Sequence, residues 1–338
     1  MGHKFVTCAS YGGTGSSAIT DFLKEFDNVN SMGDYEFTLC HEVGGLSDLQ
    51  HYLVDDWHRL KVDEGIYRFK KLAHRIEKDY NGYLNHQFSQ YTDEYINALT
   101  DCQWNGYWHQ QKFRLGSFEQ FWKYKLPIRL RREIIKIKQK YSDYELVPYQ
   151  KRQPMYFAKP DNEFFDLTKK YMEKILSSAD LEDKYEYLAF DQLVPTVNVD
   201  RYLNYFPNLK VVIVDRDPRD LYILNKKFWN EGWIPTEDVE LFIQWFAMMR
   251  TTISKEIQNP NVLLVKFEDL IYNYETESVK MMNFIGLNEN NHIRRQQFLN
   301  PERSKKNTQL WMKYNEYQND IILIEEKLGQ YCYDYSTV

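Results

Sequence analysis

The sequence is poor in cysteine and lacks long apolar runs. Its four cysteines, Cys8, Cys40, Cys102 and Cys332, are widely spaced and form no C-x-x-C pair, which argues against a disulfide framework and a zinc site. We therefore expect reduced thiols and no bound metal. No apolar run reaches 18 residues and no charged leader precedes the first apolar stretch. We expect a cytoplasmic protein without an integral membrane segment. The net charge of −6 argues against a nucleic-acid partner.

Glycine is also scarce, yet three of the 14 glycines lie within four residues, at Gly12, Gly13 and Gly15. They separate an apolar run at 5–9 from a helical pattern at 18–26, which indicates a strand, a tight turn and a helix. Glycines at such a turn let the backbone approach a ligand, and a helix N-terminus favours an anion. The candidate binding residues are Gly12, Gly13, Thr14, Gly15, Ser16 and Ser17.

The glycine pattern alone does not identify the anion. The pattern G-x-x-x-x-G-K-S/T of P-loop enzymes fails, because no lysine follows Gly15. Residues 13–18 satisfy the dinucleotide pattern G-x-G-x-x-A, so a Rossmann-type oxidoreductase that uses Asp34 or Glu36 on a ribose remains an alternative. A turn without any ligand remains another.

Five apolar or alternating stretches predict strands, and the segments between them read as helices. The strands are expected at 5–9, 34–42, 187–192, 209–214 and 262–267, with a turn at 28–33. The polar, aromatic middle of the chain predicts helices at about 46–60, 64–80, 91–101, 117–140 and 161–178. We expect an α/β fold with a P-loop-type parallel sheet of about four to five strands flanked by helices. It would form one domain over 1–338, with a helical insertion at about 46–186.

Charged residues follow two of these strands directly. Arg216 and Arg219 come just after the β-branched run at 209–214, and arginines at the carboxyl edge of a parallel sheet are natural clamps for a phosphate. Glu36 and His41 lie on the stretch predicted as the second strand, where they are candidates for general base. Ser304, Lys305, Lys306 and Asn307 form a second basic stretch near the C-terminus.

A basic amphipathic helix is predicted at 123–140, where eight Lys and Arg residues accompany one acid, Glu133. Leu126, Leu130, Ile134 and Ile137 follow one side of it. Three interpretations remain open for this helix: a solvated face, a site for an anionic substrate, or peripheral contact with a membrane surface.

In this order the elements resemble the sulfotransferases that use 3′-phosphoadenosine-5′-phosphosulfate (PAPS) and share a fold with P-loop kinases. Residues 11–19 look like the family's 5′-phosphosulfate loop, and 212–220 look like its 3′-phosphate strand and turn. Residues 266–270 are similar to its "YEDL" segment, and 304–311 resemble the C-terminal loop that lies over the cofactor. The helical middle of the chain has no counterpart in this resemblance.

The resemblance implies transfer of a sulfuryl group from PAPS to an acceptor hydroxyl, with PAP as product and no metal. The acceptor would be a small molecule, an oligosaccharide or a polysaccharide, and carbohydrate sulfotransferases place their basic glutamate where Glu36 lies. His41 is the second candidate for the base. Arg216 would bind the 3′-phosphate with help from Lys305, Lys306 or Asn307.

Two residues depart from the family pattern. Gly13 replaces the loop's usual cation, and Leu224 replaces a serine that contacts the 3′-phosphate, with Asn225 adjacent. A catalytically silent protein that binds PAP, another nucleotide or a glycan is therefore a third alternative. Aromatic residues of the insertion are candidates for sugar stacking, namely Trp104, Tyr107, Trp108 and Trp122. The oligomeric state is left open.

Overall fold

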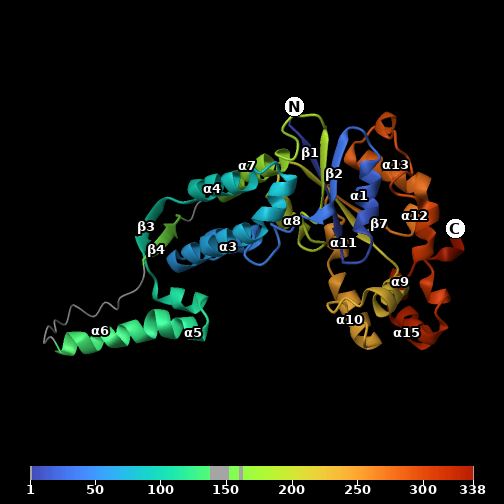
Figure 1. Cartoon of the computed structure of the whole chain (residues 1–338). Helices are drawn as coiled ribbons and strands as arrows, with labels where there is room; N and C mark the ends of the chain where they lie inside the picture. Colours follow the sequence, from blue (N-terminus) through green and yellow to red (C-terminus); the bar gives the residue numbers. More distant parts are fainter. Residues whose placement is uncertain (1, 138–151, 160–162, 338) are drawn as a thin grey trace.

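A five-stranded parallel sheet forms the centre of the protein in the computed structural model, which describes residues 2–137, 152–159 and 163–337. Its strand order is β2-β5-β1-β6-β7 (Figure 1). The strands are β1 (Lys4–Ser10), β2 (Val29–Glu36), β5 (Tyr187–Asp191), β6 (Leu209–Asp215) and β7 (Val262–Lys266). The prediction of an α/β fold with a parallel sheet flanked by helices is confirmed.

Alternate residues of the central strands enter two separate cores, as the period of a strand requires. Val6 and Cys8 of β1 face α1 (Ser16–Lys24), α12 (Asp269–Tyr272) and α13 (Tyr274–Ile285). Phe5 and Ala9 face the opposite core, which the helical insertion covers. Because both faces are covered, the carboxyl edge of the sheet is left to carry polar chemistry.

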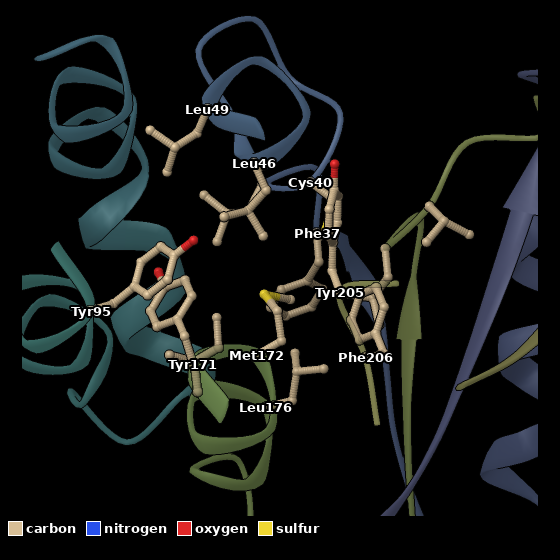
Figure 2. Packing of buried hydrophobic residues seen from close by; sticks show 14 of the residues in the cluster. Phe37, Cys40, Leu46, Leu49, Tyr95, Tyr171, Met172, Leu176, Tyr205 and Phe206 are labelled. Carbon is tan, nitrogen blue, oxygen red and sulfur yellow. The ribbon is translucent and has the colours of Figure 1, made fainter. Parts of the chain in front are cut away.

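The insertion packs on the sheet through a core rich in tyrosine and leucine (Figure 2). Tyr95 and Tyr171 stack with ring centroids 4.3 Å apart, and Phe37 meets Phe190 of β5 edge to face. Its main helices are α2 (Leu46–Gln50), α3 (Arg59–Tyr83), α4 (Phe88–Leu99) and α7 (Glu163–Ser177), with a π-helical turn at His51–Asp55.

The predicted bounds of the second strand are wrong. The strand runs from Val29 to Glu36 and therefore includes Gly33, which we expected in a turn. A Cβ on Gly33 would lie 2.2 Å from the Thr20 Cβ of α1, so glycine permits close helix-to-strand packing there. His41 consequently lies in the loop that follows the strand rather than on it.

The insertion also contains an antiparallel pair of strands that we did not predict, β3 (Cys102–Gly106) and β4 (Gln153–Phe157). The predicted helix at 117–140 is instead α5 (Ser117–Gln120), a π-helical turn (Phe121–Lys125) and α6 (Leu126–Ile137); residues 138–140 lie outside the described residues. In Figure 1, α5 and α6 lie well away from the central sheet.

Shorter helices follow in the second half of the chain. They are α8 (Val199–Leu203), α9 (Pro218–Ile223), a π-helical turn (Leu224–Trp229), α10 (Val239–Met249), α11 (Ile253–Glu256), α14 (Pro301–Ser304) and α15 (Gln318–Leu328). Across the described ranges, no helix combines the length and the apolar character that a membrane crossing needs.

Candidate functional site

The glycine turn connects the end of β1 to the start of α1 at the carboxyl edge of the sheet. Gly12, Gly13 and Gly15 have φ angles of 82°, 67° and 110°, which other residues adopt only at a cost. Within the part of the chain that the structure describes, the N–H groups of residues 13–17 make no hydrogen bond. Five unpaired donors at a helix N-terminus form a cradle for an anion.

The hydroxyl groups of this loop have different roles. Thr14 is buried; its Oγ1 donates to the Val214 carbonyl at 2.7 Å and accepts from the Tyr11 N–H at 3.2 Å. Thr14 therefore fixes the loop to β6. The Ser16 side chain lies near Asp191 and lowers the pKa of that carboxyl, whereas the Ser17 hydroxyl has no partner among the described residues, so Ser17 is the more available to a ligand.

Two indole rings lie against the outer side of the same loop. A Cβ on Gly12 would lie 1.8 Å from the ring of Trp233, and a Cβ on Gly13 would lie 2.6 Å from the ring of Trp229. Neither position can hold a side chain while these rings stay in place. The Trp229 ring thus occupies the space that a lysine side chain at position 13 would enter.

Arg216, just after β6, has the features of a second anion site. It is only 3% exposed, and its buried Nε has no hydrogen-bond partner among the described residues. Its guanidinium lies 4.4 Å from the ring centroid of Phe267, and that ring also packs against Gly15. One aromatic ring therefore separates the loop from the arginine.

Acidic groups surround Arg216, yet burial limits their charge. Burial raises the pKa of Glu268 to about 8, and it raises the pKa of Asp220 to about 6. Glu268 is therefore mostly protonated at neutral pH, which leaves Arg216 less neutralised than a simple count of acids indicates. Arg219 is not available to a ligand, because it pairs with Asp217 at 2.6 Å and with Glu325 at 2.6 Å.

The C-terminal basic stretch reaches Arg216 through its backbone. The Asn307 carbonyl accepts a hydrogen bond from the Arg216 guanidinium, while Asp220 accepts the N–H groups of the two residues after Thr308 at 2.9 and 2.7 Å. Lys305 pairs with Glu302 at 2.6 Å. Lys306 is exposed and makes no ion pair within the described ranges, and Ser304 ends α14 partly exposed.

The Asn225 side chain is hydrogen-bonded within its own segment of the chain. It is buried, and its amide donates to the Ile234 carbonyl at 3.1 Å and to Thr236 Oγ1 at 2.8 Å. It also accepts from the Glu231 N–H at 2.9 Å. These bonds hold the ends of the segment that carries Trp233, and the contact of Asn225 with a phosphate stays a prediction.

Two carboxylates meet where β2 and β5 end. Glu36 is the register partner of Asp191 and is exposed, whereas Asp191 is 5% exposed and its Oδ1 has no hydrogen-bond partner among the described residues. Burial raises the pKa of Asp191 to about 7; the Glu36 charge adds to this, and the Ser16 hydrogen bond opposes it. A buried carboxylate with a pKa near neutrality is typical of an acid or base group.

His41 is linked to the same edge by a different route. Its Nε2 lies 2.8 Å from the Gln192 carbonyl oxygen, and because a carbonyl only accepts, Nε2 carries the proton. The Gln192 side chain in turn donates to Ser10 Oγ at 2.6 Å. Gln192 therefore links His41 to the end of β1, and the His41 Nδ1 would have to act if His41 served as base.

Sequence reasoning missed Asp191 and the two tryptophans. Asp191 ends a predicted strand, so the rule that selected Glu36 could have selected it too. Trp229 and Trp233 gave no such signal, because they follow the loop by more than 200 residues.

A cavity of about 790 Å³ lies between the loop after β2 and helix α3. Its lining includes Gly44, Tyr52, Tyr67, Arg68 and Arg114, with the Arg114 guanidinium 3.7 Å from the centroid of the Tyr67 ring. Trp104, Tyr107, Trp108 and Trp122 are not among the lining residues. In residues 2–137, 152–159 and 163–337, no three His, Cys, Asp or Glu side chains gather as metal ligands would.

Comparison with known proteins gives distant structural likeness alone. No family model and no curated protein matches the sequence. The sulfotransferase domain of the curacin biosynthetic pathway is 10% identical, with a TM-score of 0.38 over 87% of this chain and 77% of that one. A Mycobacterium tuberculosis sulfotransferase is 11% identical, with a TM-score of 0.33 over 91% and 77%. Retinol dehydratase, solved with retinol and PAP, is 13% identical, with a TM-score of 0.36 over 99% and 84%. At these scores the likeness carries no argument about function.

Proposed function

We propose that this protein is a PAPS-dependent sulfotransferase that transfers a sulfuryl group to an acceptor hydroxyl. The observation that carries the proposal is the pair of anion sites: the unpaired loop N–H groups and the buried, unpartnered Arg216 Nε, separated by Phe267. A nucleotide with phosphates at both its 5′ and 3′ positions would use both sites. The loop would bind the 5′-phosphosulfate, and Arg216 would bind the 3′-phosphate. Lys306, in the basic stretch whose Asn307 contacts Arg216, would add a second cation.

In the proposed reaction, the acceptor oxygen forms a bond to sulfur as the bond from sulfur to the bridging phosphate oxygen breaks, and PAP leaves. The acceptor proton goes to the carboxylate pair of Glu36 and Asp191. Glu36 is exposed and can meet the acceptor, while Asp191 lies buried near Ser16 at the start of α1. His41, the second candidate, would act through Nδ1.

Charge that develops on the bridging oxygen would be stabilised by the loop N–H groups and the N-terminus of α1. Lys226 and Lys227, the cations nearest in sequence to Trp229, are engaged elsewhere: Lys226 donates to the Thr236 carbonyl at 2.6 Å, and Lys227 pairs with Glu316 at 2.6 Å. We expect slower transfer than a loop lysine would support.

The acceptor class is also a proposal. The cavity beside α3 is lined by Val43 and Gly44, in the loop that follows Glu36 and His41, and combines tyrosine rings with arginines. Rings suit the apolar faces of sugars, and arginines suit their hydroxyl or acidic groups. A carbohydrate acceptor fits this lining.

One observation favours a second function of a different class. Trp229 fills the space of the missing cation, as expected of a protein that binds PAP or a glycan without turnover. The oxidoreductase alternative is less well supported, because a dinucleotide fold places its second strand beside the first, whereas here β5 lies between β2 and β1.

Transfer of radiolabelled sulfate from PAPS to a panel of saccharides and small alcohols tests these functions. Labelled product with wild-type protein, reduced in the Glu36→Gln variant, supports the sulfotransferase. PAP binding without product across the panel supports the silent protein. Thermal stabilisation by NADH but not by PAP would overturn both.

A further inference from the structure

The segment from Ser117 to Ile137 exposes apolar side chains to an unusual degree. It comprises α5, the π-helical turn and α6, and none of its residues is buried. The exposed fractions are 77% for Phe118, 52% for Trp122, 55% for Leu130, 52% for Ile134 and 81% for Ile137. Single exposed apolar residues are ordinary, but five of them within one 21-residue segment indicate a surface that something covers.

The same segment is strongly basic in an acidic chain. It holds six basic and two acidic residues, a net charge of +4 against −6 for the whole protein. The basic residues are Lys123, Lys125, Arg129, Arg131, Arg132 and Lys136. Glu119 and Glu133 pair with Lys123 and Lys136 at 2.8 and 2.9 Å. The other four make no ion pair within the described ranges, so their charge is open to a partner.

Apolar and basic side chains occupy different sides of α6. Leu126, Leu130, Ile134 and Ile137 recur at spacings of four, four and three residues, which places them in one row along the helix. Arg129, Arg132 and Lys136, at spacings of three and four residues, lie on the adjacent flank. Aromatic rings lie just before the start of α6, where Phe121 and Trp122 meet edge to face with ring centroids 5.6 Å apart.

We propose that residues 117–137 lie in the surface of an anionic lipid bilayer. The apolar row would enter the boundary between head groups and acyl chains, the tryptophan would lie at the interface, and the cations would contact anionic head groups. A nucleic acid or an acidic glycan would satisfy the cations but leave the apolar row in water. The distance of α5 and α6 from the sheet in Figure 1 lets them lie on a membrane while the body stays outside it.

Sedimentation of the full chain with vesicles tests this proposal, and it needs no PAPS, so it is independent of the proposed reaction. The probes are phosphatidylcholine vesicles with and without 30% phosphatidylglycerol, at about physiological salt. We expect binding only with phosphatidylglycerol, and at least a tenfold weakening at high salt. The double variants Leu130→Ser/Ile134→Ser and Arg129→Glu/Arg132→Glu should each weaken binding at least tenfold.

A matched control is the double variant Ile322→Ser/Lys327→Glu on α15. Ile322 is 53% exposed and Lys327 is exposed. The control variant therefore replaces one apolar and one basic surface residue outside the segment 117–137, and it should leave vesicle binding unchanged. Circular dichroism verifies that every variant is folded. Three results would each overturn the proposal: no binding to anionic vesicles, binding unaffected by loss of the apolar row, or a dimer in solution that Ile134→Ser dissociates. Strong binding to RNA or heparin without vesicle binding would also overturn it.

Discussion

Glu36 and Asp191 are register partners at the carboxyl ends of β2 and β5, beside the N-terminus of α1. One is exposed and the other is buried, so two adjacent carboxylates have different environments. Such a pair binds a proton more readily than either group would alone in water.

The first prediction concerns the pH dependence of sulfuryl transfer. The pKa of Asp191 is raised to about 7, so the pair gains its full negative charge only above that pH. If the pair is the base, the rate should rise through about pH 7. Glu36→Gln should lower the rate by roughly 10²- to 10⁴-fold, and Asp191→Asn should remove the rise near pH 7. Rates from pH 5 to 9 measure both effects; an unchanged profile in Asp191→Asn would assign the base elsewhere.

The second prediction concerns Gly13 and Trp229. Gly13→Lys introduces a side chain at a φ of 67° and against the indole ring, which should lower the free energy of unfolding by about 2 to 4 kcal/mol. Adding Trp229→Ala should recover about 1 kcal/mol or more of this loss, because it removes the clash. Urea unfolding of the two single variants and the double variant measures the coupling. Additive effects would show that Trp229 does not occupy the lysine's space.

The third prediction concerns Glu268, whose pKa is raised to about 8 by burial. An acid with a raised pKa contributes stability while protonated, and this contribution is lost as pH rises from its unfolded value toward 8. Glu268→Gln should therefore raise the free energy of unfolding above pH 8, by roughly 1.4 kcal/mol for each pKa unit removed, relative to its effect at pH 5. Chemical unfolding at pH 5 and pH 9 tests this, and equal effects at both pH values would contradict it.

The fourth prediction separates two hydroxyls of the loop. Thr14→Val removes the bonds to Val214 and Tyr11 and should lower the free energy of unfolding by about 1 to 3 kcal/mol. Ser17→Ala, the matched control, removes a hydroxyl that has no partner among the residues the structure describes, and it should change stability by less than about 0.5 kcal/mol. If the loop holds the phosphosulfate, Ser17→Ala should still weaken PAP binding in calorimetry. Equal losses of stability would contradict the assignment.

The turn between β1 and α1 and the place of Arg216 after β6 could be predicted from sequence because their signals are local: clustered glycines after an apolar run, and several charged residues after a β-branched one. The binding roles of the loop and of Arg216 stay predictions. Asp191 could not be paired with Glu36, because their contact depends on β5 lying beside β2 in the sheet. The bounds of β2 were wrong because Gly33 is fixed by its contact with α1 rather than by its own preference for turns. The β3–β4 pair joins segments about 50 residues apart, and neither the exposed β3 nor the partly buried β4 shows an apolar alternation.

Calorimetry with PAP and with adenosine 5′-monophosphate tests the central claim most directly, because the two ligands differ only in the 3′-phosphate. The account predicts that wild-type protein binds PAP at least tenfold more tightly, and that Arg216→Gln abolishes this preference while binding of the 5′-monophosphate changes little. Equal affinity of the wild-type protein for both ligands, or a preference that persists in Arg216→Gln, would contradict the assignment of Arg216 and of PAPS.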